Sequence, residues 1–140
     1  PLTLSPSHPL TLLFPQITGL RVLRLSGNNM SDASAANILA ALKLQQNLRE
    51  LDLSHNKLTD AHLAALSALL TEQKFTHLHS INLAGNIFTD KGLSSYVDAL
   101  VAACPGVSVL AMSENKLGDG SAAHLLRLSE KHSGVHVCIK

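Results

Sequence analysis

Tryptophan is absent from this 140-residue chain, and one tyrosine and three phenylalanines are its only aromatic residues. Proteins that bind single-stranded nucleic acid stack the bases on aromatic side chains, and this sequence is too poor in them to form such a platform. An excess of one charge is also missing, because 11 Lys and Arg residues face 10 Asp and Glu residues. A domain that binds phosphates needs a basic surplus, so we expect no nucleic-acid partner.

Long apolar runs and a cysteine framework are lacking as well. No stretch reaches the roughly 18 apolar residues of a transmembrane helix, so we expect no membrane association. Two cysteines are too few for a small secreted domain held together by disulfides. Hydrophobic residues nevertheless make up 46% of the chain and charged residues 15%, which indicates a folded domain with a core rather than a disordered tail.

The two cysteines and the first residues bear on where the protein acts. The chain begins Pro-Leu rather than with Met, and we interpret it as a piece of a longer protein. Cys104 and Cys138 fall in repeat units that are not neighbours, so they should lie too far apart for a disulfide. We therefore expect two free, buried thiols and an intracellular location, with the cytoplasm as first choice.

What the chain does contain is an internal repeat. The pattern L-x-x-L-x-L-x-x-N recurs with conservative replacements, and the four copies occupy residues 20–28, 48–56, 78–86 and 107–115. The asparagines that close the copies are spaced by 28, 30 and 29 residues. Four matched segments at one period predict a solenoid, in which each unit buries its apolar side against the next.

Each unit joins a strand pattern to a helix pattern. The alternation in L-x-x-L-x-L is typical of a short strand with one buried face. The second half has helical spacing, for example Leu63, Leu66 and Leu70, and it begins after a Ser, Thr or Gly followed by Asp. Those side-chain oxygens can accept the free N–H groups of a helix start. We expect the helical segments to begin after Asp32, Asp60, Asp90 and Asp119.

Stacked strand–helix units give an α/β solenoid. Its strands form a parallel sheet on the concave side of a curved horseshoe, and its wider helices lie on the convex side. Each asparagine comes as the chain turns out of its strand. Its side chain can satisfy backbone groups of adjacent turns, so we predict a buried asparagine ladder rather than a catalytic or metal-binding row.

These residues closely resemble the leucine-rich repeat family. The unit length, the full helix and the N-x-L-x-D signature resemble the ribonuclease-inhibitor-like subclass. The resemblance covers residues 20–134 as four repeats. Residues 1–19 contain Pro6, Pro9 and Pro15 and fit a degenerate repeat without a helix, or an N-terminal edge. Residues 135–140 fit the start of a fifth strand.

Few residues are candidates for metal binding or catalysis. The eight histidines include the pair His77-Leu-His79, but no cysteine or aspartate completes a four-ligand metal set there. His62 and His124 fall within helices, where we expect them to face solvent or to pack on a neighbour. No phosphate-binding loop, nucleophile elbow or zinc-protease motif occurs. We therefore expect no enzyme activity, no cofactor, no metal and no small-molecule substrate.

The concave face is the remaining candidate site. The x positions of the strand motif point away from the core and form rows from coil to coil. One row reads Arg24, Asp52, Asn82 and Ala111, and falls from charged to apolar. One interpretation is a graded docking surface, and the alternative is a solvated sheet face on which Arg24 and Asp52 simply pair across adjacent strands. The full set of expected partner-binding residues is Arg21, Arg24, Arg49, Glu50, Asp52, His55, His79, Asn82, Val109, Ala111 and Glu114.

The sequence thus favours a non-enzymatic protein-interaction module, which the resemblance also implies. An alternative is a structural scaffold arm of a multiprotein assembly, or of a receptor like the nucleotide-binding innate sensors. A further alternative follows from the resemblance to GTPase-activating proteins for the small GTPase Ran, although their usual acidic region is missing here. The identity of the partner does not follow from the repeat, because the exposed positions set specificity.

Overall fold

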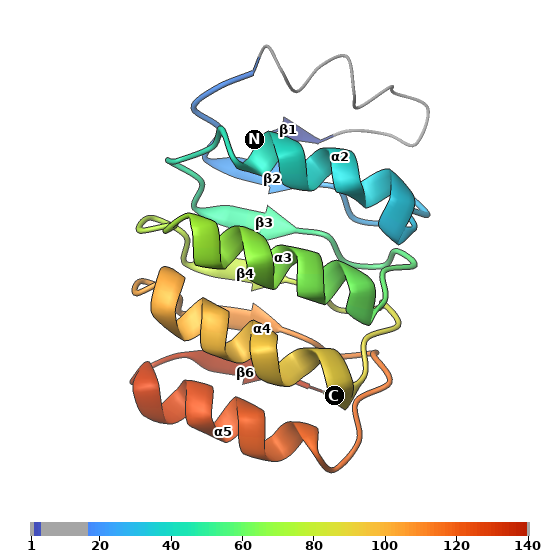
Figure 1. Ribbon diagram of the computed structural model, residues 1–140, viewed down its shortest axis with the longest axis vertical. Coiled ribbons are helices and arrows are strands. Elements are labelled where there is room, and N and C mark those ends of the chain that lie inside the picture. The colour runs from blue at the N-terminus through green and yellow to red at the C-terminus, as the bar shows by residue number, and fades with distance from the viewer. Residues whose placement is uncertain (1, 4–16, 140) are drawn as a thin grey trace.

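The computed structural model describes residues 2–3 and 17–139, and these form a six-stranded parallel sheet whose strand order follows the chain. The strands are β1 (Leu2–Thr3), β2 (Val22–Arg24), β3 (Glu50–Asp52), β4 (Ser80–Asn82), β5 (Val109–Ala111) and β6 (His136–Cys138). The helices within these residues are α2 (Asp32–Leu42), α3 (Asp60–Glu72), α4 (Asp90–Ala103) and α5 (Ser121–Lys131). Figure 1 shows the helices stacked in one layer over one face of the sheet. The expected α/β solenoid is confirmed.

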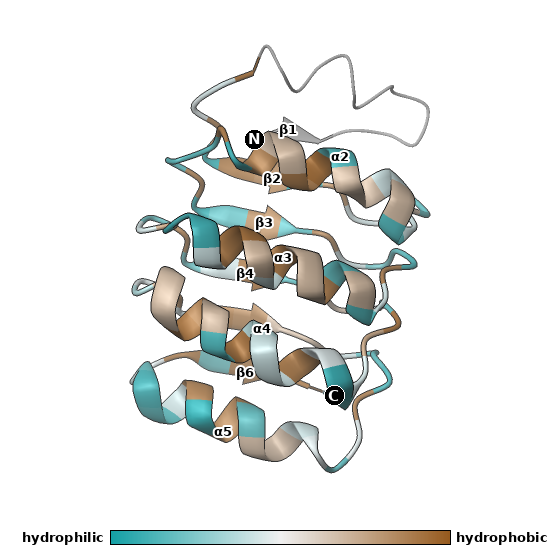
Figure 2. Ribbon diagram, in the orientation of Figure 1, coloured by the Kyte–Doolittle hydropathy of each residue, from teal (hydrophilic) through white to brown (hydrophobic). Residues whose placement is uncertain are grey.

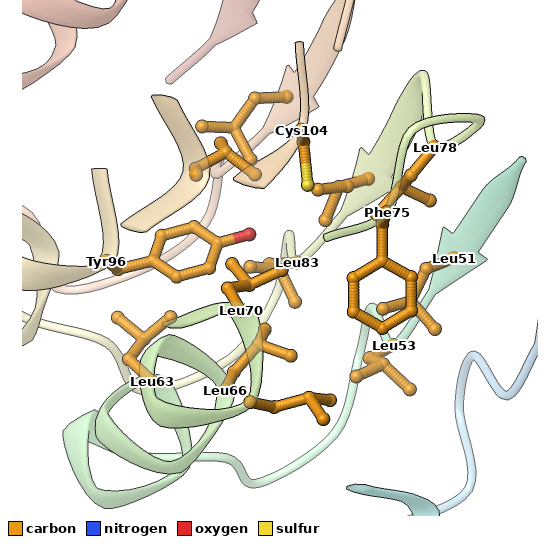
Figure 3. Close-up of a cluster of buried hydrophobic side chains, with 14 of the residues drawn as sticks. Leu51, Leu53, Leu63, Leu66, Leu70, Phe75, Leu78, Leu83, Tyr96 and Cys104 are labelled. Atoms are coloured by element: carbon orange, nitrogen blue, oxygen red, sulfur yellow. The ribbon is translucent and has the colours of Figure 1, made fainter. Parts of the chain in front are cut away.

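The motif leucines build the core because every strand pairs with the next in the same register. Leu23 pairs with Leu51, Leu51 with Ile81, and Ile81 with Leu110. Each of these side chains is buried. The helix leucines predicted from 3- and 4-residue steps pack against them, and Figure 3 shows side chains of α3 meeting those of the strand motifs.

Two aromatic residues fill the core between the helix layer and the sheet. Phe75 and Tyr96 are buried, and both rings point into the cluster in Figure 3. Among the described residues the Tyr96 hydroxyl has no hydrogen-bond partner, and burial raises the pKa of Tyr96. Burial also raises the pKa of Cys104 to about 12, which keeps this thiol protonated and unreactive.

The cysteines are both free, but only one is buried as expected. Cys104 lies at the end of α4 and is fully buried, whereas Cys138 in β6 is exposed. The prediction that Cys138 is buried was therefore wrong. Cys138 occupies an x position of its strand, so its side chain points away from the core that Val137 faces.

The predicted asparagine ladder is present and ties consecutive coils together. The Asn86 side-chain oxygen accepts a hydrogen bond from the Leu58 N–H of the preceding coil, at 3.1 Å. Its amide nitrogen donates to Leu53 O of that coil and to Leu83 O of its own, both at 3.0 Å. Asn56 and Asn115 repeat this arrangement one coil earlier and one coil later. Each amide thus serves backbone groups of two coils.

A second ladder runs along the helix starts. The sequence pattern did not show that its Asp carboxylates bind the following coil. The Asp60 carboxylate accepts from the Thr89 backbone N–H at 2.8 Å and from the Thr89 hydroxyl at 2.5 Å. Asp32 binds Thr59 in the same way. The threonines also cap their own helices as predicted, since Thr59 Oγ1 accepts from Ala61 N. The carboxylates therefore link neighbouring coils as well as favouring helix N-termini.

The last helix departs from this rule. The first three helices begin at the Asp itself, whereas α5 begins at Ser121, after Asp119, with Gly120 as its N-cap. Gly118 stands where the other coils have Ser or Thr, so Asp90 accepts only its backbone N–H, at 2.9 Å. A Cβ at Gly120 would lie 2.9 Å from Asp90 Oδ2. The chain therefore passes close to this carboxylate before it turns into the helix.

His62 takes the second of the two positions expected for it, packed against its neighbours. It lies in the first turn of α3 and is 1% exposed, so it does not face solvent. Neither ring nitrogen has a hydrogen-bond partner among the described residues. Burial lowers the pKa of His62, and the nearby Asp32 carboxylate partly opposes this shift. The structure therefore holds a neutral imidazole inside the protein.

Replacement of a ladder asparagine should destabilise the fold. In Asn86→Ala, the buried Leu58 N–H loses its partner among the described residues. The carbonyls of Leu53 and Leu83 each lose one of two donors, since Asn56 and Asn115 still bind them. We expect the free energy of unfolding to fall by about 1–3 kcal/mol in urea denaturation, which is the usual cost of one unsatisfied buried group. The matched control is Asn47→Ala at an exposed turn. A loss as small as that of the control would contradict a structural role for the ladder.

The buried His62 should make stability depend on pH. The unfolded chain takes up a proton below about pH 6.5, while the folded chain resists it because its pKa is lowered. Stability should therefore fall as the pH drops from 7 to 5, by at most about 1.4 kcal/mol per pH unit from this group. We expect His62→Leu to flatten the fall in urea denaturation, whereas His77→Gln, at an exposed position, should not. Equal slopes for all three proteins would contradict this.

Candidate functional site

The concave face is built from rows of side chains that cross the parallel strands. The register aligns one x position of each strand in a central row: Arg24, Asp52, Asn82, Ala111 and Cys138. A second row consists of Val22, Glu50, Ser80, Val109 and His136. Neighbouring members of a row sit on strands about 4.8 Å apart. The rows therefore form a continuous surface rather than separate residues.

A third row lies just before the strands begin. The Arg49 N–H donates to Arg21 O at 2.7 Å, and the His79 N–H donates to Arg49 O at 3.0 Å. In the same way the Ser108 N–H donates to His79 O at 2.8 Å. Arg21 and Arg49 are exposed, and His79 is half-buried. Within residues 2–3 and 17–139, neither arginine side chain has an ion pair or hydrogen bond.

The expected pairing of Arg24 with Asp52 is wrong. The two residues are register partners, but Arg24 Nη2 lies 3.0 Å from Glu50 Oε2, in the neighbouring row. The long arginine side chain reaches diagonally, because the Asp52 carboxylate is already engaged within its own coil. Both members of the ion pair are solvent-accessible, so it is worth at most about 1 kcal/mol.

Asp52 is held by a serine two residues further on. Its Oδ1 accepts the Ser54 backbone N–H at 2.9 Å and lies 2.6 Å from the Ser54 hydroxyl. That hydroxyl also lies 2.8 Å from the Ser26 hydroxyl of the preceding coil. Asn82 uses its side-chain oxygen similarly, accepting from Ala84 N at 3.1 Å. These short-range bonds fix the side chains that leave the strands, a role that the strand motif alone did not predict.

The loops after the strands add His55 and Glu114 to the opposite edge of the face. Both are exposed and adopt the left-handed conformation, with φ of 52° and 55°. Two other coils have Gly27 and Gly85 at this position, with φ of 69° and 65°. The His55 ring lies over Gly85, where a Cβ would come within 2.3 Å of the ring Nδ1 atom. Glycine at 85 is therefore required for His55 to keep its place.

The character of the face changes along the solenoid. Arg21, Arg24, Arg49, Glu50 and Asp52 all belong to the coils of β2 and β3, and Figure 2 shows the hydrophilic ends of β3. Over β4 and β5 the strand positions are polar or apolar but uncharged. Val109 and Ala111 are half-buried there. The fall from charged to apolar that the sequence predicts is thus laid out across adjacent strands.

Comparison with known proteins agrees with this architecture. The model of the family described as Leucine Rich repeat matches residues 18–39, 45–67 and 76–95. The structure resembles that of leiomodin-1 actin-binding site 2, with a TM-score of 0.73 over 93% of this chain and 75% of that one. At 15% identity, this likeness concerns the fold alone. The chain contains leucine-rich repeats.

Among curated relatives, the leucine-rich repeat segment is similar to Tonsoku-like proteins. It is 34% identical to the Bos taurus protein over 104 residues, which is 74% of this chain and 8% of that protein. It is 38% identical to the Mus musculus protein over 94 residues, covering 66% of this chain and 7% of that protein. The chain thus spans less than a tenth of the length of these relatives.

Other candidate sites are few in the part of the chain that the structure describes. Among the described residues, no three His, Cys, Asp or Glu side chains gather as potential metal ligands. No described helix is long and apolar enough to cross a membrane. On the helical side, Lys43 pairs with Glu72 across α2 and α3 at 3.1 Å, and Arg127 contacts Asp98 across α4 and α5. These ion pairs join helices of adjacent repeats.

The corrected pairing on the concave face can be tested by double-mutant cycles. We expect Arg24→Ala and Glu50→Ala to be coupled by about 0.2–1 kcal/mol in the free energy of unfolding, as for other exposed ion pairs. The cycle of Arg24→Ala with Asp52→Ala is the control and should give a coupling near zero. A larger coupling with Asp52 than with Glu50 would show that the arginine prefers its register partner in solution.

Proposed function

We propose that this chain is a non-enzymatic protein-interaction module of a larger intracellular protein, which binds its partner through the concave face. The observation that supports this most is the fixed spacing of exposed side chains in rows about 4.8 Å apart. Ladders of buried hydrogen bonds hold these rows before any partner arrives. A surface that is already ordered loses little conformational freedom on binding.

The partner-binding residues that we propose span all three rows and the adjoining loops. They are Arg21, Arg24, Arg49, Glu50, Asp52, His55, His79, Asn82, Val109, Ala111 and Glu114. The positions of the three groups with shifted pKa values favour a binding role of the face over a catalytic one. His62, Tyr96 and Cys104 are all buried in the core, away from the concave face.

We also propose that the repeats belong to the ribonuclease-inhibitor-like subclass. The 28- to 30-residue spacing of the asparagines and complete helices of 11 to 14 residues support it. The free thiols of Cys104 and Cys138 support an intracellular location for the whole protein. The similar Tonsoku-like proteins are far longer than this chain, consistent with a module within a larger protein.

A second candidate is a scaffold segment packed permanently in an assembly. The observation in its favour is that Leu126 on α5 and Ile139 after β6, both in the last coil, are 61% and 48% exposed. Permanent burial of this end predicts that the isolated chain self-associates. A monodisperse monomer in analytical ultracentrifugation would favour the docking module instead.

Affinity capture from lysate of the source cells tests the docking proposal. The bait variant Arg24→Ala/Arg49→Ala/Asp52→Ala should lose a partner that the unchanged chain retains, by at least tenfold in recovered protein. The control Lys43→Ala/Arg127→Ala/Asp98→Ala removes the same number of charges of each sign from the helical side and should retain it. A partner kept by the first variant and lost by the second would move the site to the helices.

A further inference from the structure

We propose that the concave face accepts an extended peptide whose acidic end lies over Arg21 and Arg49 and whose small apolar end lies over Val109 and Ala111. This inference rests on the proposed function and names the chemistry of the partner. The chain as a whole has a formal charge of only +1. A preference for acidic peptides therefore depends on which positive charges of the concave face lack a partner, and not on the overall charge.

Most charges on the charged half of the face are already compensated or held within the protein. Glu50 pairs with Arg24 at 3.0 Å, and the Asp52 carboxylate accepts the Ser54 N–H at 2.9 Å. Arg21 and Arg49 have no such partner within residues 2–3 and 17–139, and both are exposed. Two cations of the same row are thus left for a partner to neutralise.

The geometry of these two arginines suits a carboxylate-bearing strand. The hydrogen bond from Arg49 N to Arg21 O places them on adjacent coils, about 4.8 Å apart at the backbone. Acidic residues at positions i and i+2 of an extended peptide lie on one side, about 6.6 Å apart. The arginine side chains are flexible enough to span the difference between these two spacings. Each guanidinium can bind a carboxylate with two hydrogen bonds. His79 adds a third nitrogen-bearing side chain in the next coil.

The opposite half of the face sets the direction of the peptide. From β2 to β5 the rows cross three strand spacings, or about 14 Å, which four to five extended residues span. The half-buried Val109 and Ala111 at that end present small apolar side chains and give no charge to pair. Acidic residues bound there would lose water without gaining a cation.

A nucleic acid fits these observations less well. Phe75 and Phe88 are buried, so neither ring is available for a base to stack on. With Glu50 paired to Arg24, only Arg21 and Arg49 of the charged residues on this half of the face are left to bind phosphates within the described residues, too few for a phosphate backbone that followed the face. A peptide places its carboxylates selectively, whereas a nucleic acid carries a charge at every nucleotide.

Selection from a random ten-residue peptide library displayed on phage tests the proposal. The unchanged chain should enrich peptides with two acidic residues, spaced i and i+2, near one end and small apolar residues near the other. The best peptide, made with a fluorescent label, should bind Arg21→Gln/Arg49→Gln at least tenfold more weakly in fluorescence anisotropy. The control Lys43→Gln/Arg127→Gln should bind it as the unchanged chain does. Circular dichroism confirms that each variant is folded.

The remaining outcomes overturn the proposal. Enrichment of peptides without excess Asp and Glu, no enrichment at all, or equal binding by Arg21→Gln/Arg49→Gln would each do so. Displacement of the labelled peptide by a 20-nucleotide single-stranded RNA, with tighter binding of the RNA itself, would replace it with a nucleic-acid site. If the lysate partner still depends on Arg24, Arg49 and Asp52 in those cases, the docking function stands and only the acidic-peptide chemistry fails.

Discussion

The buried amide of the ladder asparagine is the interaction on which the rest of the structure depends. A primary amide has both acceptor and donor atoms, so Asn86 can receive the Leu58 N–H and donate to Leu53 O while also closing its own turn at Leu83 O. Without it the Leu58 N–H would be buried and unpaired, and each carbonyl would keep only the donor from a neighbouring ladder asparagine. The ladder thereby sets how one coil sits on the next.

The fixed stacking of coils explains why a sheet of three-residue strands presents an ordered surface. Each strand contributes few backbone hydrogen bonds, but the asparagine ladder continues the pairing beyond it and the Asp–Thr ladder holds the helix starts. Asp60 binding Thr89 joins the α3 coil to the α4 coil in this way. The second ladder weakens where Gly118 replaces a hydroxyl residue, and there the helix begins later.

On this surface, the balance of local bonds decides which charges can serve a partner. Five charged residues lie close together on the coils of β2 and β3, yet Glu50 compensates Arg24 and Ser54 holds Asp52. Only Arg21 and Arg49 stay uncompensated within the described residues. The face therefore combines a nearly neutral composition with a local basic edge, and specificity arises from the position of the charges rather than from their number.

Periodicity determined the fold from the sequence alone, because leucines at fixed spacing can be buried in only one stacked arrangement, and it placed the asparagine ladder and the rows of the concave face. Only the tertiary structure decided which side chains pair across coils. Arg24 selects Glu50 over its register partner, Asp60 bonds to Thr89 of the next coil, and His62 is buried. The physical reason is that side-chain reach and competition between nearby donors and acceptors depend on distances in space, which the spacing of residues along the chain does not contain.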